Sequence, residues 1–179
     1  MSRLFVAINL PALVSAKLAR LQPSPCAGLK LISMTQMHLT LHFIGEAAIS
    51  PVIDALQTVR AQPFLFRLAG LGQFRVNGGV TLWAGVDVNE ALLALRMAVG
   101  LALSSLRFRP EARRYTPHVT LARCKPAVPA QVISQFMASS AMLDLPEVAV
   151  AGFALYSSTM SSEGSQYSCE QWFPLHCGR

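Results

Sequence analysis

The sequence is poor in charged residues and lacks paired cysteines and any long apolar run. Charged side chains make up 13% of the 179 residues and hydrophobic ones 53%, which excludes a disordered chain. Its four cysteines form no Cys-x-x-Cys pair, and a chain of this size needs no disulfides, so we expect reduced thiols in the cytoplasm. The longest apolar stretch, residues 91–103, contains Arg96 and is too short to cross a bilayer, so we expect no membrane segment.

Patterns that bind metals are also missing from the sequence. No cluster of Asp and Glu has the character of a Mg²⁺ site. Cys169, His176 and Cys177 lie near one another in the chain, but their spacing fits no common zinc pattern. We therefore expect neither a metal nor another cofactor.

The few charges that are present are mostly positive. Fifteen Lys and Arg residues against nine Asp and Glu give a net charge of +6, and twelve of the fifteen are arginine. The planar guanidinium group suits phosphate. Charge alone favours anionic partners, but it leaves a basic protein without any nucleic-acid role equally open.

One short motif occurs twice, 80 residues apart: His-Leu-Thr-Leu at 38–41 and His-Val-Thr-Leu at 118–121. Each copy lies in an apolar run that predicts a β-strand. Because strand side chains alternate, the His and Thr of each copy project from one face and the two apolar residues from the other. Two such strands facing each other would present two imidazoles and two hydroxyls to a small anion such as a phosphate.

This set of side chains suits proton transfer at phosphorus. The ordinary pKa of histidine, about 6.5, allows either protonation state near neutrality. Of His38 and His118, one can take a proton from water while the other gives a proton to a leaving oxygen. Thr40 and Thr120 can donate hydrogen bonds to phosphate oxygens. A single His-x-Thr strand is usually structural, and it is the repetition in matching contexts that favours catalysis.

The surrounding elements repeat as well. The order strand, helix, His-x-Thr strand, helix, strand, strand occurs over residues 3–78 and again over 80–176, which predicts a duplicated α+β fold. We expect one domain, residues 1–179, of two intertwined lobes related by a pseudo-twofold axis. Two antiparallel sheets flanked by helices would then enclose a cleft that carries both motifs. The expected strands are 4–10, 38–45, 64–74, 80–86, 118–125, 148–157 and 166–175, and the expected helices are 11–21, 50–61 (with Ser50 as its N-cap), 89–106 and 129–138.

The chain resembles the two-histidine (2H) phosphoesterase superfamily, and in particular the bacterial LigT-like RNA 2′,3′-cyclic phosphodiesterases. The resemblance rests on RLFVAI at 3–8, HLTLHFIGE at 38–46, TPHVTLAR at 116–123, LYSS at 155–158, Gly164, Tyr167 and WFPL at 172–175. It covers nearly the whole chain, and the combination is more specific than either short motif alone.

The resemblance implies a bilobal α+β fold and metal-independent hydrolysis of an RNA 2′,3′-cyclic phosphate to a 2′-phosphate. Some relatives also join RNA ends reversibly through 2′–5′ linkages. By the family pattern, His38 is the proton donor to the leaving 3′ oxygen and His118 is the base that activates water. The implied partner is RNA with a cyclic phosphate end, such as a tRNA fragment, bound by a monomer.

Two further residues are candidates for substrate binding. Arg123 matches a family arginine five positions after the second histidine, and Phe43 is an aromatic that could stack on a base. Strict strand alternation directs Arg123 away from His118, so this arginine reaches phosphate only if the strand bends or ends there, and a surface or supporting role is the alternative. It also directs Phe43 away from His38, which leaves a core role for Phe43 at least as open as stacking. The same alternation puts His42 on the face of His38, where it lies at the edge of the site or has a structural role.

Other functions remain open at this level. The same chemistry could act on small cyclic nucleotides or on 2′–5′ oligonucleotides, and a non-catalytic nucleotide-binding module could share the fold. Four arginines, at 107, 109, 113 and 114, precede the second motif. They could guide an RNA backbone toward the site, or they could simply be a solvated loop.

Overall fold

The computed structural model describes residues 2–76, 78–106, 108, 114–139, 147–161 and 164–176. Its helices are α1 (Ala12–Ala19), a short 3₁₀ helix (Met34–Gln36), α2 (Ile49–Leu56), α3 (Glu90–Ser104) and α4 (Ala130–Ala138). Its strands are β1 (Ser2–Asn9), β2 (Leu29–Leu31), β3 (His38–Ala47), β4 (Phe64–Phe66), β5 (Leu68–Val76), β6 (Gly79–Val86), β7 (His118–Cys124), β8 (Val148–Val150), β9 (Gly152–Ser161) and β10 (Gly164–Pro174). The predicted α+β class is therefore confirmed.

The N-cap predicted for the second helix is wrong. Helix α2 begins at Ile49, its N-cap is Ala48, and no side chain caps it. Ser50 and Pro51 therefore lie inside the first turn rather than before it. Pro51 is tolerated there because the first backbone N–H groups of a helix have no intrahelical acceptor, so a residue without an N–H loses nothing.

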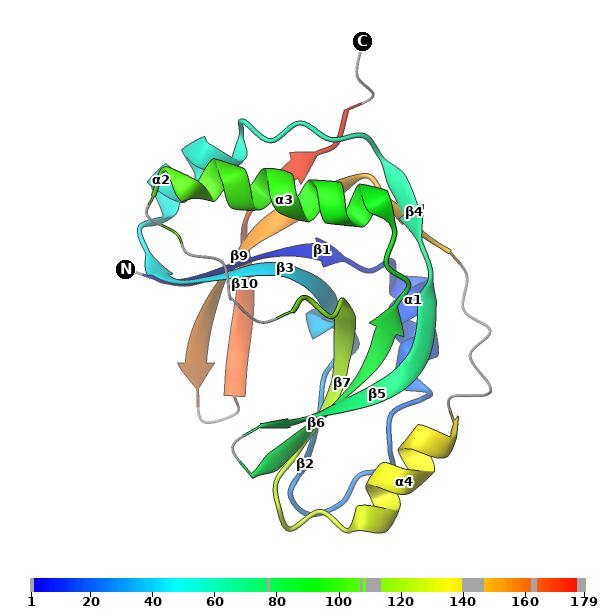
Figure 1. Cartoon of the computed structure of the whole chain (residues 1–179). Helices are drawn as coiled ribbons and strands as arrows, with labels where there is room; N and C mark the ends of the chain where they lie inside the picture. Colours follow the sequence, from blue (N-terminus) through cyan, green and yellow to red (C-terminus); the bar gives the residue numbers. More distant parts are fainter. Residues whose placement is uncertain are drawn as a thin grey trace.

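Eight of the described strands form one large antiparallel sheet, where the sequence predicted one sheet on each side of a cleft. Its order is β10-β9-β1-β3-β7-β6-β5, with β2 beside β7, and β4 pairs with β8 in a small second sheet. The two halves of the large sheet meet where β3 and β7 lie side by side (Figure 1). A single residue pair, Leu39 with Val119, joins them there.

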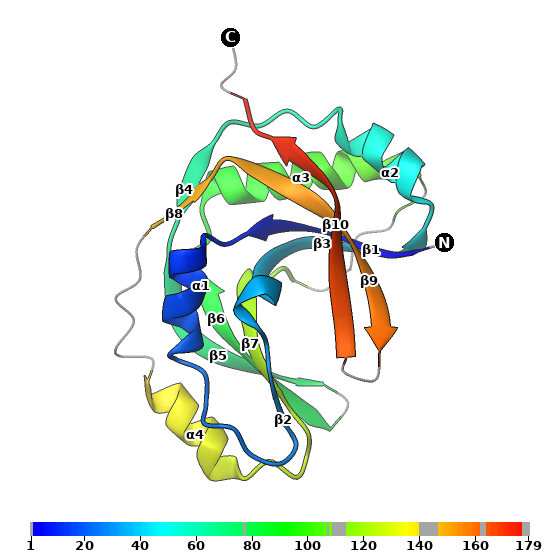
Figure 2. The same ribbon diagram turned by 180° about the vertical axis from the view of Figure 1, so that it is seen from behind.

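Strands from the two sequence units are exchanged between the halves of this sheet. Strand β5 belongs to the first unit but pairs with β6 of the second. Strand β9 belongs to the second unit but pairs with β1 of the first, and β10 pairs with β9. Each half of the sheet therefore contains strands from both units, as the views from the two sides show (Figures 1 and 2).

Helix α3 covers part of this sheet and packs against β3. Its buried residues are Leu92, Leu95, Val99 and Leu103, spaced three and four apart so that they form one stripe. Asn89 caps the helix, since its side-chain oxygen accepts a hydrogen bond from the backbone N–H of Leu92. Among the described residues, no helix has both the length and the apolar character needed to cross a membrane.

Candidate active site

The two motif strands place their histidines and threonines on one face of the sheet. Leu39 and Val119 form the pair that joins β3 to β7, and both side chains are completely buried. Residues on either side of a paired position project from the opposite face. His38, Thr40, His118 and Thr120 therefore share the face opposite this core pair, and none of them is fully buried. The structure thus brings together the four residues that the motif predicted.

Both imidazoles are held in the same way. The Nδ1 atom of His38 lies 2.7 Å from the carbonyl oxygen of Gln36, and Nδ1 of His118 lies 2.7 Å from that of Thr116. A carbonyl only accepts, so Nδ1–H is the donor in each bond, and a neutral ring carries its lone pair on Nε2. In both motifs the reactive nitrogen is consequently Nε2.

Aromatic side chains surround each imidazole, and no local signal in the sequence indicates them. The ring of His38 lies 4.9 Å from Phe5 and 5.4 Å from Tyr167, measured between centroids. The ring of His118 lies 4.9 Å from Phe74 in an edge-to-face arrangement. These contacts come from strands far from the motifs in sequence, so they become visible only once the sheet order is known.

The site disfavours protonation of both histidines. Burial is the main cause that lowers the pKa of His38 and of His118 from the ordinary 6.5. The positive charge of Arg123 lowers both further, and His118 adds to the lowering at His38. The hydrogen bonds from Nδ1 to the carbonyl groups act in the opposite direction. Arg123 is therefore close enough to act electrostatically on both rings.

A β-bulge in β7 explains how Arg123 reaches this face. The register between β6 and β7 skips Leu121: Thr120 lies opposite Trp83, and Arg123 lies opposite Thr81. Trp83 and Thr81 are two residues apart in β6 and so share a face. Thr120 and Arg123 consequently share a face as well, although they are three residues apart.

The first motif contains the same bulge at the equivalent position. The register between β1 and β3 skips Leu41, so that Thr40 lies opposite Ala7 and Phe43 lies opposite Phe5. Ala7 and Phe5 share one face of β1, which puts Thr40 and Phe43 on one face of β3. The Phe43 side chain is 58% exposed there.

The predictions from strict alternation are therefore wrong at Arg123, Phe43 and His42. Each bulge shifts the phase of the strand by one residue, which turns Arg123 and Phe43 toward the site and His42 away from it. His42 is 5% exposed on the opposite face, and its Nε2 lies 2.8 Å from the carbonyl oxygen of Arg96. Phe108 packs edge-on against its ring. His42 is thus a core residue.

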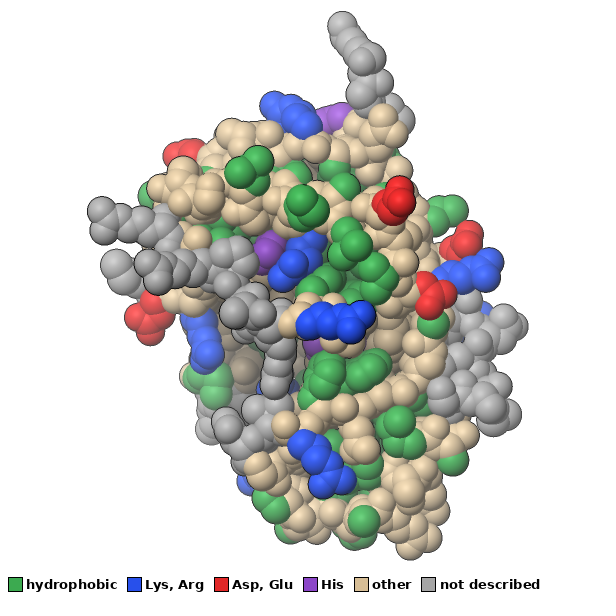
Figure 3. All heavy atoms as spheres, viewed as in Figure 1, with side chains coloured by type: hydrophobic (Ala, Val, Ile, Leu, Met, Phe, Trp, Pro, Cys, Tyr) green, Lys and Arg blue, Asp and Glu red, His purple; other side chains and the backbone are tan. Residues whose placement is uncertain are grey.

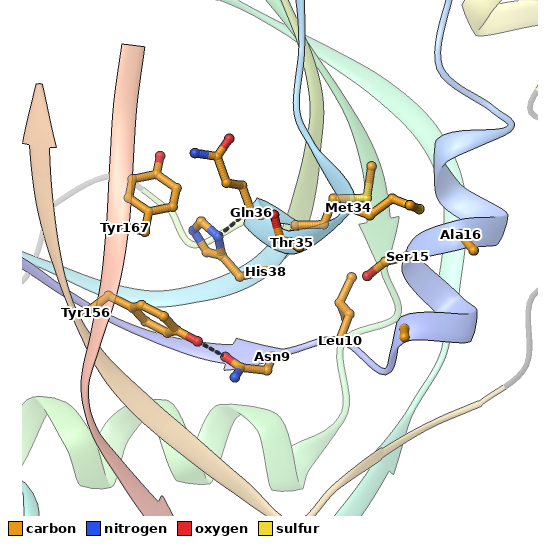
Figure 4. A pocket seen from close by; sticks show the side chains of 12 residues that line it. Asn9, Leu10, Ser15, Ala16, Met34, Thr35, Gln36, His38, Tyr156 and Tyr167 are labelled. Carbon is orange, nitrogen blue, oxygen red and sulfur yellow. Dashed lines mark hydrogen bonds between the residues drawn. The ribbon is translucent and has the colours of Figure 1, made fainter. Parts of the chain in front are cut away.

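A pocket of about 480 Å³ lies beside His38 (Figure 4). Tyr156 donates a hydrogen bond to the side-chain oxygen of Asn9 at its wall. Gln36 donates from its amide to the carbonyl oxygen of Ser165 in β10. Both apolar and polar residues line the pocket, and none of them comes from β6 or β7. They are Asn9, Leu10, Ala12, Ser15, Ala16, Met34, Thr35, Gln36, Met37, His38, Tyr156 and Tyr167.

Basic side chains extend across the face shown in Figure 3, whereas the acidic ones lie toward its edges. Arg114 is described and exposed. The other three arginines of the predicted basic loop, at 107, 109 and 113, lie outside the described residues, as does Cys177. Within the described part of the chain, no group of three or more His, Cys, Asp or Glu side chains could hold a metal ion.

An antiparallel α+β fold with two His-x-Thr strands at its centre defines the two-histidine class that the sequence resembles. The chain belongs to the 2′-5′ RNA ligase superfamily, whose family model matches residues 11–159. It is 32% identical to the RNA 2′,3′-cyclic phosphodiesterase of Thermus thermophilus, over 97% of this chain and 90% of that protein. It is 31% identical to the enzyme of the same name from Aeropyrum pernix, over 84% of this chain and 90% of its relative.

Solved structures agree with this assignment of the fold. A crystal structure of a Thermus thermophilus protein matches with a TM-score of 0.76 and 30% identity, covering 97% of both chains. The structure of E. coli LigT complexed with 3′-AMP matches with a TM-score of 0.74 at 22% identity, covering 97% of this chain and 98% of that one.

Proposed function

We propose that this protein hydrolyses the 2′,3′-cyclic phosphate at the end of an RNA to a 2′-phosphate, with His38 and His118 as the acid and the base and without a metal. The observation that carries the proposal is the shared sheet face, on which two equivalent imidazoles and two hydroxyls converge. The curated relatives with about 30% identity over most of the chain are RNA 2′,3′-cyclic phosphodiesterases, which supports this choice of substrate.

The proposed reaction is a single in-line displacement at phosphorus. Nε2 of His118 takes a proton from water, and the water oxygen forms a bond to phosphorus. The bond between phosphorus and the 3′ oxygen breaks, and Nε2–H of His38 gives its proton to that oxygen. The products are a 2′-phosphate and a 3′-hydroxyl, and exchange with solvent restores both rings. A 5′-hydroxyl of a second RNA in place of water would give a 2′–5′ linkage by the same steps.

The remaining side chains of this face would hold the phosphate. Thr40 and Thr120 donate hydrogen bonds to its non-bridging oxygens, and Arg123 supplies a positive charge that its bulge directs toward the site. Positioning and charge stabilisation of this kind account for most of the catalysis in phosphoryl transfer. Phe43, exposed on the same face, offers a surface on which an RNA base can stack.

The position of the pocket supports the assignment of the two roles. In an in-line displacement the attacking and leaving oxygens lie on opposite sides of phosphorus. The pocket beside His38 has the size and the mixed lining expected for a nucleoside. A nucleoside bound there places its 3′ oxygen on the His38 side and leaves the His118 side for water. We accordingly assign His38 as the acid and His118 as the base.

We also infer that the two halves of the sheet act as two lobes of one domain, with the substrate in a cleft between them. The exchange of β5 and β9 between the sequence units supports a single interlocked domain. The single residue pair that joins β3 to β7 supports a division at that point.

The pH dependence tests the two-histidine mechanism. The active form has His38 protonated and His118 neutral, and the site lowers the pKa of both below 6.5. His38 loses its proton as the pH rises through its lowered pKa, and His118 gains one as the pH falls through its own, so kcat/KM should follow a bell-shaped curve with its maximum below pH 6.5. Initial rates between pH 4 and 9 measure this curve. A maximum above pH 7.5, or a single-limbed profile, would contradict the mechanism.

Replacing Arg123 with glutamine should raise the pKa of both histidines, because it removes a positive charge that opposes their protonation. The maximum of kcat/KM should move to higher pH, and its value should fall about tenfold or more as a charged phosphate contact is lost. NMR titration of the imidazole signals measures the pKa values directly.

The matched control for this variant is Arg60→Gln. Arg60 lies in an exposed loop and hydrogen-bonds to the carbonyl groups of Gln57 and Val59. It should change neither the pKa values nor the rate. Unchanged pKa values in Arg123→Gln would show that this arginine does not face the histidines.

A further inference from the structure

Each of the two bulges is held by side chains from the other sequence unit. In β7, the carbonyl oxygen of the bulged Leu121 accepts a hydrogen bond from the backbone N–H of Ile32, at 2.9 Å. It accepts a second one from the side-chain amide of Gln22, at 2.8 Å. The same amide nitrogen donates to the carbonyl oxygen of Ile32 at 2.7 Å. Gln22, which follows α1 in the first unit, therefore holds the strand of the second motif.

The bulge in β3 has the reciprocal arrangement. The carbonyl oxygen of the bulged Leu41 accepts a hydrogen bond from Nε of Arg96 in α3, at 3.3 Å. The carbonyl oxygen of Thr40 accepts one from the Tyr115 hydroxyl, at 3.0 Å. The guanidinium carbon of Arg96 lies 4.2 Å from the centre of the Tyr115 ring, a cation–π contact that holds the two side chains together.

Tyr115 also connects the two motifs directly. It lies three residues before His118 and next to Thr116, whose carbonyl group orients the His118 ring. Its hydroxyl binds the backbone of Thr40 in the other motif. Burial raises the pKa of Tyr115 to about 12, so the hydroxyl stays protonated and able to donate.

These contacts occur where the sheet has the fewest backbone hydrogen bonds between its strands. A bulge disrupts the ladder of hydrogen bonds and leaves the extra residue unpaired, and β3 and β7 share only one residue pair. The direction of Thr40 and of Arg123 then depends on what fixes the backbone at each bulge. A displacement of about 1 Å at a reacting centre can cost about a hundredfold in rate.

We propose that Tyr115 and Gln22 are positioning residues that act across the two sequence units. Tyr115 fixes the direction of the Thr40 side chain, and Gln22 fixes the direction of the Arg123 side chain. The proposal rests on the proposed function for its kinetic tests. Neither side chain contacts the phosphate in the proposed mechanism. Both act through the backbone carbonyl groups that they hold.

The first test is Tyr115→Phe, which keeps the ring under Arg96 and removes only the hydroxyl. We expect kcat to fall about ten- to a hundredfold, with KM changed less than about twofold. The control is Asn89→Ala, which removes the cap of α3 away from the site. It should lower the melting temperature while leaving kcat unchanged. A Tyr115→Phe enzyme with kcat within twofold of wild type would overturn the proposal for Tyr115.

A double-mutant cycle distinguishes positioning from general destabilisation. If Tyr115 acts through Thr40, Tyr115→Phe should have little further effect on kcat in a Thr40→Val background. By the same reasoning, Gln22→Met, which removes the donors but keeps the length of the side chain, should have little further effect in an Arg123→Gln background. Effects that multiply in both cycles would overturn the proposal.

A substrate-free measurement keeps this proposal separate from the proposed function. Arg123 lowers the pKa of both histidines, and His118 lowers that of His38 as well. The other titratable groups beside His38 are the phenols of Tyr156 and Tyr167. Gln22→Met should therefore raise the histidine pKa values toward those of Arg123→Gln in an NMR titration. If wild type fails to cleave the cyclic phosphate, the proposed function fails, and this titration alone decides on Gln22. Unchanged pKa values would overturn its role.

Discussion

Replacing His118 with alanine is expected to lower kcat for RNA with a 2′,3′-cyclic phosphate end by about 10²- to 10⁴-fold, the usual contribution of a general base. His118 is the residue that takes the proton from water, and the bond from its Nδ1 to the Thr116 carbonyl leaves Nε2 for that task. No other imidazole on this face can replace it, because His38 is engaged on the leaving-group side. The loss should appear in kcat, since the threonines and Arg123 still bind the phosphate.

The matched control is His176→Ala. His176 is exposed near the end of the described chain, and its backbone N–H bonds to the carbonyl group of Ala61, a contact that any residue can make. This variant should keep full activity. Circular dichroism and thermal unfolding should show that His118→Ala still folds. A His118→Ala enzyme within tenfold of the wild-type rate would exclude His118 as the base.

Replacing His38 with alanine should cause a loss of similar size on RNA, but the loss should depend on the leaving group. His38 donates a proton to the 3′ oxygen, and a poor leaving group such as an alkoxide needs that proton. A substrate in which sulfur replaces the 3′ oxygen releases a thiol, whose pKa of about 8.5 makes protonation largely dispensable. On that substrate the loss should shrink to less than about tenfold for His38→Ala.

A comparison with His118→Ala on the same two substrates distinguishes the general acid from the general base. Removal of the base should slow both substrates alike, because water has to be deprotonated in either case. The experiment measures four single-turnover rates, one for each variant on the oxygen substrate and on the sulfur substrate. If the sulfur substrate instead relieved the defect of His118→Ala, the acid and base assignments would have to be exchanged.

The sequence predicted most elements of this fold, because amphipathic patterns are local, but the predicted strands 64–74 and 148–157 are each two strands in the structure. The motif strands, the helices after them and the α+β class all follow from the periodicity of apolar residues. The partners of the strands do not follow from it. Strand β9 pairs with β1, about 150 residues away in the chain, and nothing in the alternation of either strand specifies the other.

The bulges mark the point at which local prediction fails in the site itself. Alternation placed His38 and Thr40 correctly relative to each other, since no extra residue separates them. It failed from Leu41 and Leu121 onward, where Arg96 and Gln22 bind the bulged carbonyl groups from distant parts of the chain. The directions of the Phe43 and Arg123 side chains therefore depend on tertiary contacts and cannot be read from the local sequence. The same holds for the pocket beside His38, whose residues come from several elements.

Product analysis with a short RNA ending in a 2′,3′-cyclic phosphate tests both the reaction and its two-histidine mechanism. Wild type and His118→Ala are incubated with it in EDTA, and the position of the product phosphate is read by chromatography against 2′- and 3′-phosphate standards. We predict a 2′-phosphate from wild type, undiminished by EDTA, and almost none from His118→Ala. A 3′-phosphate, a reaction that EDTA abolishes, or equal product from the variant would contradict the two-histidine account.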